Sequence, residues 1–143
     1  MTTNIVYNTK KFETDGMRVT CTLVSTFNLD SLPELRALLV TKRVKKMLEE
    51  KHCEVTTDNN IIFTTTGEAK FNPEDDKFDE NIGRHLAEDR ATEKAMNKVL
   101  LIYKWLIMYT MNIKDRVWDR VITMATLVEK MHQHNEDTKH NPQ

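Results

Sequence analysis

Few residues of this chain could carry out chemistry. His52 and Cys53 are adjacent, and these are the residue types from which thiol nucleophiles and their bases are built. Because neighbouring residues of a strand point to opposite faces, we expect the two side chains to be poorly placed to share a proton. His85, close to Glu88 and Asp89, is most simply an exposed helix residue. We therefore predict no catalytic residues.

Motifs for metals and phosphates are equally weak. His132 and His134 have the spacing of metal ligands on a strand, but they fall near the end of an expected helix without a cluster to complete a site. A chain with three glycines offers little material for a glycine-rich phosphate cradle. We expect no metal, no cofactor and a protein that is not an enzyme.

An acidic segment precedes the second long helix. Residues 68–80 hold six carboxylates and two lysines, a net charge of −4. Two interpretations stay open: a surface that binds a basic partner protein, and an acidic cap on the positive end of the helix. The candidate partner-binding residues here are Glu74, Asp75, Asp76 and Asp79.

A basic segment lies on the first expected helix. Residues 34–51 hold six basic and three acidic side chains, a net charge of +3. Nucleic acid is the alternative partner that this patch suggests, although no aromatic residue interleaves the cations. A solvated helix face with spaced charge pairs is the simpler interpretation. The candidate nucleic-acid-binding residues are Arg36, Lys42, Arg43, Lys45 and Lys46.

The aromatic and methionine-rich end of the chain is the most informative surface. Residues 99–111 are apolar almost all round, so a helix there needs cover on several sides. Either the last helix folds back on it as a helical hairpin, or a second subunit or another protein covers it. Because Trp, Tyr and Met are favoured at interfaces, the candidate partner-binding residues also include Trp105, Tyr109 and Trp118.

The first third of the chain predicts a β-hairpin. Residues 17–27 alternate and are rich in β-branched types, and the segment 5–7 can pair with them across the turn Asp15-Gly16. One face of the longer strand would hold Val19, Cys21, Leu23 and Ser25. Two further strands are expected at 52–57 and 61–70.

Three helices are expected. The first begins near Ser31, with Asp30 or Ser31 as its N-cap, and ends near Lys51. The second begins near Glu80 or Asn81, Asn112 marks a bend or a break, and the third covers 113–134. The expected buried positions of the second helix are Ile82, Leu86, Ala87, Ala91, Ala95, Val99 and Ile102. The third carries an amphipathic stripe, Val117, Val121, Met124, Val128 and Met131.

These elements predict an α+β fold: an antiparallel sheet of three or four strands packed by two helices, with an additional C-terminal helix. We expect an α+β domain over residues 1–111 and a C-terminal helix over 112–135, packed on that domain or on a second subunit. Residues 136–143 are expected to be a frayed tail.

Residues 67–100 resemble a family of small bacterial and phage proteins of unknown function, with a fold like that of double-stranded-RNA-binding domains. The resemblance rests on a glycine and a small residue at the end of a strand, a Pro-x-Asp loop, and Ile-Gly, Leu-Ala and Arg-Ala on the next helix. The matching residues are Gly67, Ala69, Pro73, Asp75, Ile82, Gly83, Leu86, Ala87, Arg90 and Ala91. It implies that fold for the domain. Double-stranded-RNA-binding domains place lysines at the start of this helix, whereas this chain has carboxylates, which favours a partner other than RNA.

The net charge, the cysteine count and the longest apolar run narrow the class of protein. The net charge of −1 disfavours a general polyanion binder, and two cysteines suit a reducing, intracellular setting. The longest apolar run, residues 99–111, is too short to span a bilayer. We expect a cytoplasmic protein, encoded by a phage or mobile element, that binds and modulates a host protein, for example as an inhibitor of a bacterial defence system. A homodimer through the C-terminal helices stays open.

Overall fold

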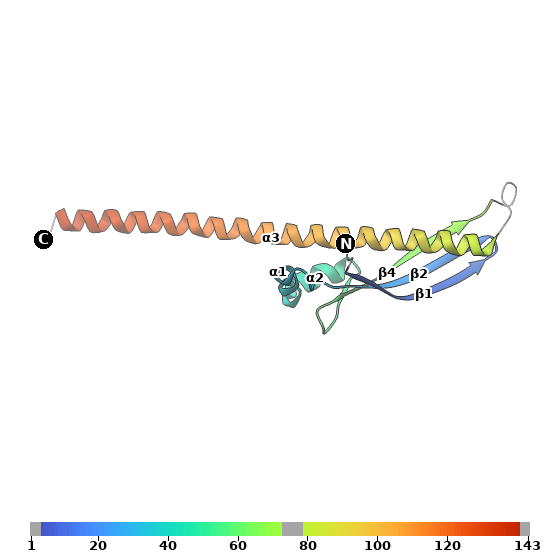
Figure 1. The fold of residues 1–143 in the computed structure, drawn as a ribbon. Coiled ribbons are helices and arrows are strands. Elements are labelled where there is room, and N and C mark those ends of the chain that lie inside the picture. Colours follow the sequence, from blue (N-terminus) through green and yellow to red (C-terminus); the bar gives the residue numbers. More distant parts are fainter. Residues whose placement is uncertain (1–3, 73–78, 141–143) are drawn as a thin grey trace. The chain divides into compact units, whose positions relative to one another are not determined.

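The computed structural model describes residues 4–72 and 79–140. The chain divides into two compact units, Met1–Leu106 and Ile107–Gln143. One helix, α3 (Glu80–His140), contributes to both units (Figure 1). The units are described separately below.

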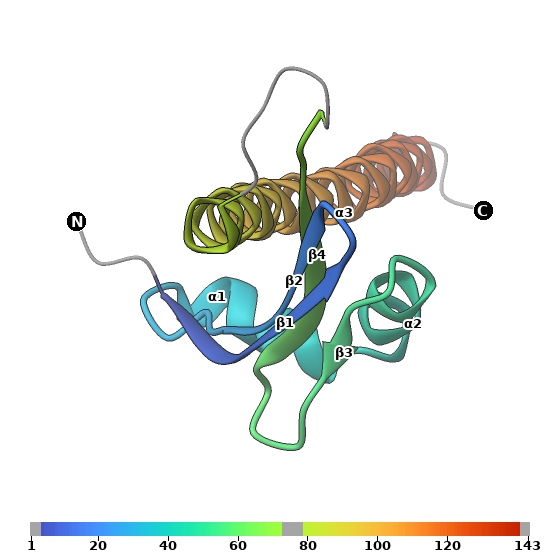
Figure 2. The same cartoon turned by 90° about the vertical axis from the view of Figure 1, so that its right-hand side faces the viewer.

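A four-stranded antiparallel sheet forms the centre of the first unit. Its strands are β1 (Ile5–Asp15), β2 (Arg18–Phe27), β3 (Glu54–Val55) and β4 (Ile61–Lys70), in the order β1-β2-β4-β3 (Figure 2). The predicted α+β class is therefore confirmed.

The predicted hairpin is present and longer than expected. β1 pairs with β2 along its length, from Ile5 opposite Phe27 to Asp15 opposite Arg18. Gly16 sits at the turn with φ 62°, a conformation that glycine adopts without a steric penalty. The register shifts between Tyr7 and Thr9, a β-bulge in the edge strand.

One face of β2 supplies the core, as the alternation of its residues predicted. Val19, Cys21, Leu23 and Ser25 are all fully buried, while the threonines of the opposite face are half-buried. An antiparallel sheet with one packed face and one solvated face has this pattern.

The helix predicted between Ser31 and Lys51 is instead three short pieces: α1 (Pro33–Arg36), a 3₁₀ turn η1 (Ala37–Val40) and α2 (Lys42–Glu50). Thr41, extended at ψ 129°, separates the last two. It follows Val40, and two successive β-branched residues weaken a helix. The predicted N-cap was also wrong: Leu32 holds that position without a side-chain cap bond among the described residues. The Ser31 hydroxyl instead accepts a hydrogen bond from Asn4 Nδ2 at 2.8 Å.

Small residues on α3 let it lie close to the sheet. Gly83, Ala87, Ala91 and Ala95 recur every four residues and are all buried, so they make one smooth face. Val99, Ile102 and Leu106 continue the buried row.

Two of the expected core residues of this helix are exposed. Ile82 is 52% exposed and Leu86 is 40% exposed, so the prediction was wrong for both. Each precedes a small residue that faces the sheet, and one residue step turns a helix by about 100°. The close-packed small residues, rather than the larger apolar ones, therefore define the buried face.

The bend predicted at Asn112 is absent, because α3 is one helix from Glu80 to His140. The chain has no Gly or Pro between Gly83 and Pro142, and Asn costs a helix well under 1 kcal/mol relative to Ala. The helical hairpin is therefore wrong, since residues 113–134 continue the helix that contains 99–111. The tail expected from residue 136 is helical as far as His140.

Candidate functional site

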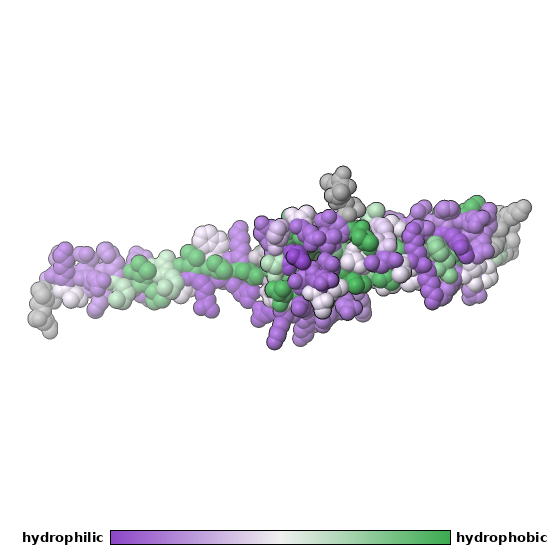
Figure 3. Space-filling model, turned by 60° about the horizontal axis from the view of Figure 1, so that its bottom comes forward, coloured by the Kyte–Doolittle hydropathy of each residue, from purple (hydrophilic) through white to green (hydrophobic). Residues whose placement is uncertain are grey.

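The second unit is a helix that exposes its apolar residues. Between residues 107 and 131 a set of large apolar side chains has exposed fractions from 46% for Val121 to 63% for Val128. The set consists of Ile107, Met108, Met111, Val117, Trp118, Val121, Ile122, Met124, Leu127, Val128 and Met131. Figure 3 shows hydrophobic side chains following this part of α3.

Five of these residues form a row that we call the apolar stripe. Its members, at alternating steps of four and three residues, are Val117, Val121, Met124, Val128 and Met131. Such steps keep side chains on one side of a helix, and they are also the spacing of a coiled-coil seam. All five are exposed, so the predicted stripe lies on the surface of the described chain.

One hollow of this helix lies on the flank of the stripe, between Ile113, Arg116, Val117, Asp119 and Arg120. Two others lie along the stripe itself. One, of ≈ 410 Å³, lies between Lys114, Val117, Trp118 and Val121. The other, of ≈ 390 Å³, is lined by side chains from two further turns: Met124, Leu127, Val128, Met131, His132 and Asn135. The sequence pattern predicted the stripe but not Leu127, which lines the second of these hollows. Leu127 could have been found from the heptad positions that flank the stripe.

The acidic segment is only partly described. Glu74, Asp75 and Asp76 lie outside the described residues. Asp79 precedes α3, and its Oδ1 accepts hydrogen bonds from the backbone N–H of Asn81 at 2.9 Å and of Ile82 at 3.3 Å. A carboxylate in this position satisfies free N–H groups and favours the positive helix end. Asp79 thus caps the helix, as one of the two interpretations predicted.

Trp105 is half-buried in the first unit. The ammonium of Lys51 lies 4.6 Å from its ring centroid and that of Lys98 lies 5.5 Å away. Lys98 Nζ also donates to the carbonyl oxygen of Lys51 at 2.7 Å, which ties α3 to the end of α2. These contacts give Trp105 a packing role. Tyr109 and Trp118 belong to the second unit, where Tyr109 is half-buried and Trp118 is 57% exposed.

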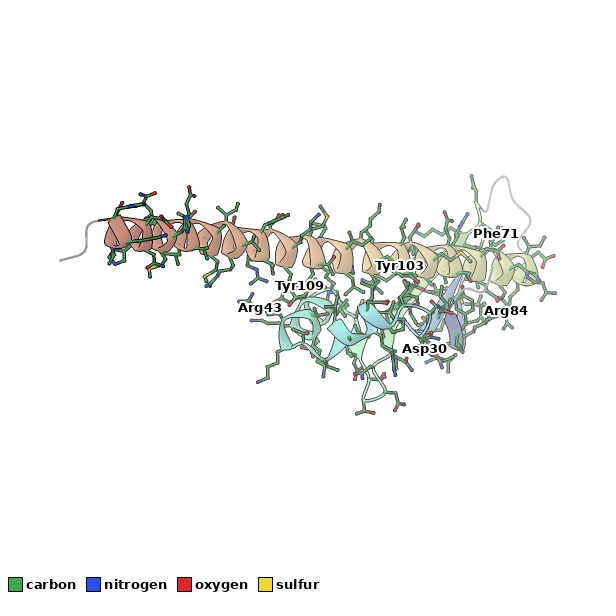
Figure 4. The ribbon with its side chains drawn as sticks, turned by 60° about the vertical axis from the view of Figure 1, so that its left-hand side comes forward. Asp30, Arg43, Phe71, Arg84, Tyr103 and Tyr109 are labelled. Atoms are coloured by element: carbon green, nitrogen blue, oxygen red, sulfur yellow. The ribbon has the colours of Figure 1, made fainter. Side chains whose placement is uncertain are left out.

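The basic patch falls on α2. Lys42, Arg43 and Lys46 are exposed and Lys45 is half-buried; within 4–72 and 79–140 none of them forms an ion pair. Arg43 is labelled in Figure 4. Arg36 differs, because its Nε lies 3.5 Å from Asp30 Oδ1 and its NH2 donates to the carbonyl oxygen of Asp58 at 3.1 Å. Arg36 therefore stabilises a local turn.

His52 and Cys53 mark the end of α2. His52 adopts φ 61°, and the next N–H, that of Cys53, donates to the carbonyl oxygen of Leu48 at 2.8 Å. A left-handed residue followed by such a bond is a common way to end a helix, so the unusual backbone of His52 has a structural cause. Both residues line a hollow of ≈ 410 Å³ beside Glu49, Glu54 and β4.

The Cys53 side chain is a poor nucleophile. It is 2% exposed, its Sγ lies 3.7 Å from the carbonyl oxygen of Lys51, and burial raises the pKa of its thiol. Burial likewise raises the pKa of Cys21. A raised pKa leaves little thiolate at neutral pH. His85 is exposed on α3.

Among the described residues, no group of His, Cys, Asp and Glu side chains is placed to hold a metal ion. No described helix is long and apolar enough to cross a membrane. Comparison with family models, with curated proteins and with solved structures found no significant match to this chain.

Proposed function

We propose that this chain is a non-enzymatic interaction protein that binds another protein molecule through the apolar stripe of α3. The observation that carries the proposal is the exposure of all five stripe residues on one side of the helix. Contiguous exposed apolar surface of this kind marks an interaction site.

Burial of the stripe would supply a useful free energy. Fully burying a Val or Met side chain contributes about 1.5–3 kcal/mol, so covering a half-exposed one contributes roughly 1 kcal/mol. An isolated helix is marginal in water, and most helices depend on packing of their apolar side. Covering the stripe would therefore both drive association and stabilise residues 107–140 as a helix.

The charges around the stripe favour a protein over a lipid surface or a nucleic acid. Residues 107–140 hold five basic side chains, Lys114, Arg116, Arg120, Lys130 and Lys139. They also hold five acidic ones, Asp115, Asp119, Glu129, Glu136 and Asp137. Helices that lie on membranes carry a cationic polar face, and nucleic-acid binders need excess positive charge.

The kind of target follows from the resemblance of residues 67–100 to small phage and bacterial proteins. On that basis we propose that the chain is encoded by a phage or mobile element, and that it modulates a host protein in the cytoplasm. Inhibition of a bacterial defence system is one form of this activity. A dimeric protein would present two copies of the first unit to such a target, which strengthens binding by raising the effective concentration of the second site.

Pull-down from bacterial lysate tests this proposal with three tagged proteins. The stripe variant Val121→Asp/Val128→Asp places carboxylates in the stripe. The control Thr123→Asp/Lys130→Asp also introduces two carboxylates at a seven-residue spacing, but elsewhere on the helix, and it adds one more negative charge than the stripe variant does. We expect a specific host protein with the wild type and the control, and its loss or weakening with the stripe variant. Recovery of no specific protein by the wild type would contradict the host-protein proposal.

A second candidate function is nucleic-acid binding by α2. Exposed Lys42, Arg43 and Lys46, without ion pairs among the described residues, favour it. Such cations are free to contact phosphates, and their contribution would fall steeply with salt. The short α2 and the acidic Glu49 and Glu50 at its end weigh against it.

A further inference from the structure

We propose that the molecule covering the apolar stripe is a second copy of this chain, with the two α3 segments antiparallel. In this pairing Val117 of one copy lies opposite Val128 of the other, and Val121 lies opposite Met124. The proposal rests on the proposed function, because it names the partner of the same stripe. It commits the pair to one orientation and one register.

The seam extends beyond the stripe in both directions. Steps of three and four residues continue from Val117 back to Ile107 and from Met131 on to Thr138. In an antiparallel coiled coil, heptad position a of one helix faces heptad position d of the other. With Val117 opposite Val128, every seam position from 107 to 138 has a seam position facing it. The four central layers are wholly apolar, and polar layers such as Lys114 with Met131 lie outside them.

The two hollows are related by the same pairing. In a coiled coil, each side chain of the seam inserts into a hole formed by four residues of the facing helix. The first hollow has such a frame: Lys114, Val117, Trp118 and Val121. Its centre falls opposite Val128 of the second copy, and Val128 itself lines the second hollow.

The contact of the first hollow's residues with the second hollow of the other copy is equivalent by symmetry. Val117 and Trp118, which line the first hollow, face the second hollow of the other copy. One patch thus complements itself about a two-fold axis between Ile122 and Thr123, as a symmetric dimer requires. A parallel pair would instead place each hollow against its own counterpart.

The flanks of the seam match in size. In the proposed register Trp118 lies beside Ala125 of the second copy, so a large side chain meets a small one. On the other flank, Arg120 lies beside Leu127, where its aliphatic stem can cover the leucine while its guanidinium reaches water. A register one heptad further along would place Trp118 beside His132 and would remove Ile107 and Thr110 from the overlap.

Charge also distinguishes the two orientations. Residues 107–122 carry a net charge of +1, from Lys114, Arg116, Arg120, Asp115 and Asp119. Residues 123–140 carry a net charge of −1, from Lys130, Lys139, Glu129, Glu136 and Asp137. The antiparallel pair sets each half against the half of opposite charge. A parallel pair would set like against like and place Lys114 against Lys114 in the seam, which is unfavourable.

The contact is large enough to be specific. The paired segment of 32 residues is about 48 Å long at a rise of 1.5 Å per residue, and a helix is about 10 Å across. A strip of that size on both helices amounts to roughly 1,000 Å², about the lower bound for a specific interface.

Cysteine cross-linking of the full chain tests the orientation and the register. The single variants Val117→Cys and Val128→Cys are made separately, oxidised alone, and oxidised after mixing. Both sites are exposed, so the substitutions leave the first unit intact. The native Cys21 and Cys53 are buried, so the wild type is the control for background cross-linking. We expect a covalent dimer in the mixture, and its absence in each variant alone and in the wild type.

Each result of the cross-linking experiment either supports or overturns the antiparallel pairing. In the antiparallel pair position 117 of one copy would lie 11 residues from position 117 of the other, about 16 Å along the axis, which a disulfide cannot bridge. Cross-linking of each single variant alone would therefore overturn the antiparallel pairing. No cross-linking in any sample, with a sedimentation mass of one chain, would overturn self-association. The proposed function would still stand in that case if the pull-down recovers a host protein that the stripe variant does not.

Discussion

Gly67 on β4 lies directly against the backbone of Ala87 on α3. A Cβ atom at Gly67 would be 2.1 Å from the Ala87 carbonyl oxygen and 2.4 Å from the Ala91 nitrogen. Helix backbone cannot move aside as a flexible side chain can, so this contact requires a residue without a side chain. It sets how closely the helix packs on the sheet, and hence which face of α3 the first unit buries.

Gly67→Ala should therefore destabilise the first unit strongly. Overpacking a well-packed core costs about 1–3 kcal/mol and occasionally more, and we expect at least the upper end here because the clash is with backbone. The matched control is Gly16→Ala, at a turn with φ +62° and nothing within 4 Å of the added atom. It should cost only about 1–2 kcal/mol, for the left-handed backbone alone. Urea unfolding of both variants measures the difference, and equal losses would contradict the close packing.

Ser25→Ala should stabilise the protein. The Ser25 hydroxyl is fully buried on β2 and, within the described part of the chain, has no hydrogen-bond partner. Removing an unsatisfied buried hydroxyl recovers a desolvation cost of about 1 kcal/mol. The control is Thr65→Val, because Thr65 Oγ1 donates to the Ala91 carbonyl oxygen at 2.9 Å. That variant should lose about 1 kcal/mol. Thermal unfolding should move the two melting temperatures in opposite directions; a lower melting temperature for Ser25→Ala would contradict this expectation.

The buried thiols should make stability fall at alkaline pH. Burial raises the pKa of Cys21 and Cys53 above the ordinary 9.0. The unfolded chain then releases these protons at lower pH than the folded chain does. Their contribution is fully present below pH 9.0 and is lost as pH rises toward the folded-state pKa.

The measurement is the free energy of unfolding between pH 8 and pH 10, for the wild type and for Cys53→Ala. The variant should start less stable, because a buried side chain is shortened, but its stability should fall less steeply with pH. Identical slopes would show that Cys53 does not contribute. At pH 8, a thiol reagent should modify the native protein much more slowly than the unfolded chain.

Charge reversal on α2 tests nucleic-acid binding. If α2 contacts phosphates, mobility shifts with duplex and single-stranded DNA and RNA should be salt-sensitive and should vanish when Lys42, Arg43, Lys45 and Lys46 are changed to Glu. We expect no shift at low salt, because the proposed interaction site is the stripe on α3. A shift that the charge reversal removes would instead establish α2 as a nucleic-acid site.

The sequence allowed the hairpin strand at 17–27 and its buried face to be predicted, because alternation along those residues is a local signal, and it placed a further strand at 61–70. It also located the row of small residues at Gly83, Ala87 and Ala91. The expected buried positions from Ala87 to Ile102 are confirmed, but Ile82 and Leu86 were wrongly included, because the edge of the buried face depends on the Gly67 contact between distant segments. Ile82 and Leu86 look like core residues until the close packing of the alanines is known.

The break at Thr41 and the continuity at Asn112 were both missed. Single residues of modest helix propensity do not decide whether a helix ends, since tertiary context routinely overrides propensity. The stripe itself was predicted correctly, because its spacing is local. The sequence pattern of one helix does not say what covers the stripe, and the pairing with a second copy stays a proposal. The two hollows along the stripe are the structural observation on which that proposal rests.

Sedimentation equilibrium of the purified full chain tests the central claim most directly. The wild type and the control Thr123→Asp/Lys130→Asp should both sediment with twice the 16.8 kDa mass of one chain, in a concentration-dependent manner. The stripe variant Val121→Asp/Val128→Asp should sediment as one chain, because it would bury unpaired carboxylates at the seam. A wild-type mass of one chain at all concentrations, or a stripe variant that still forms dimers, would contradict the account.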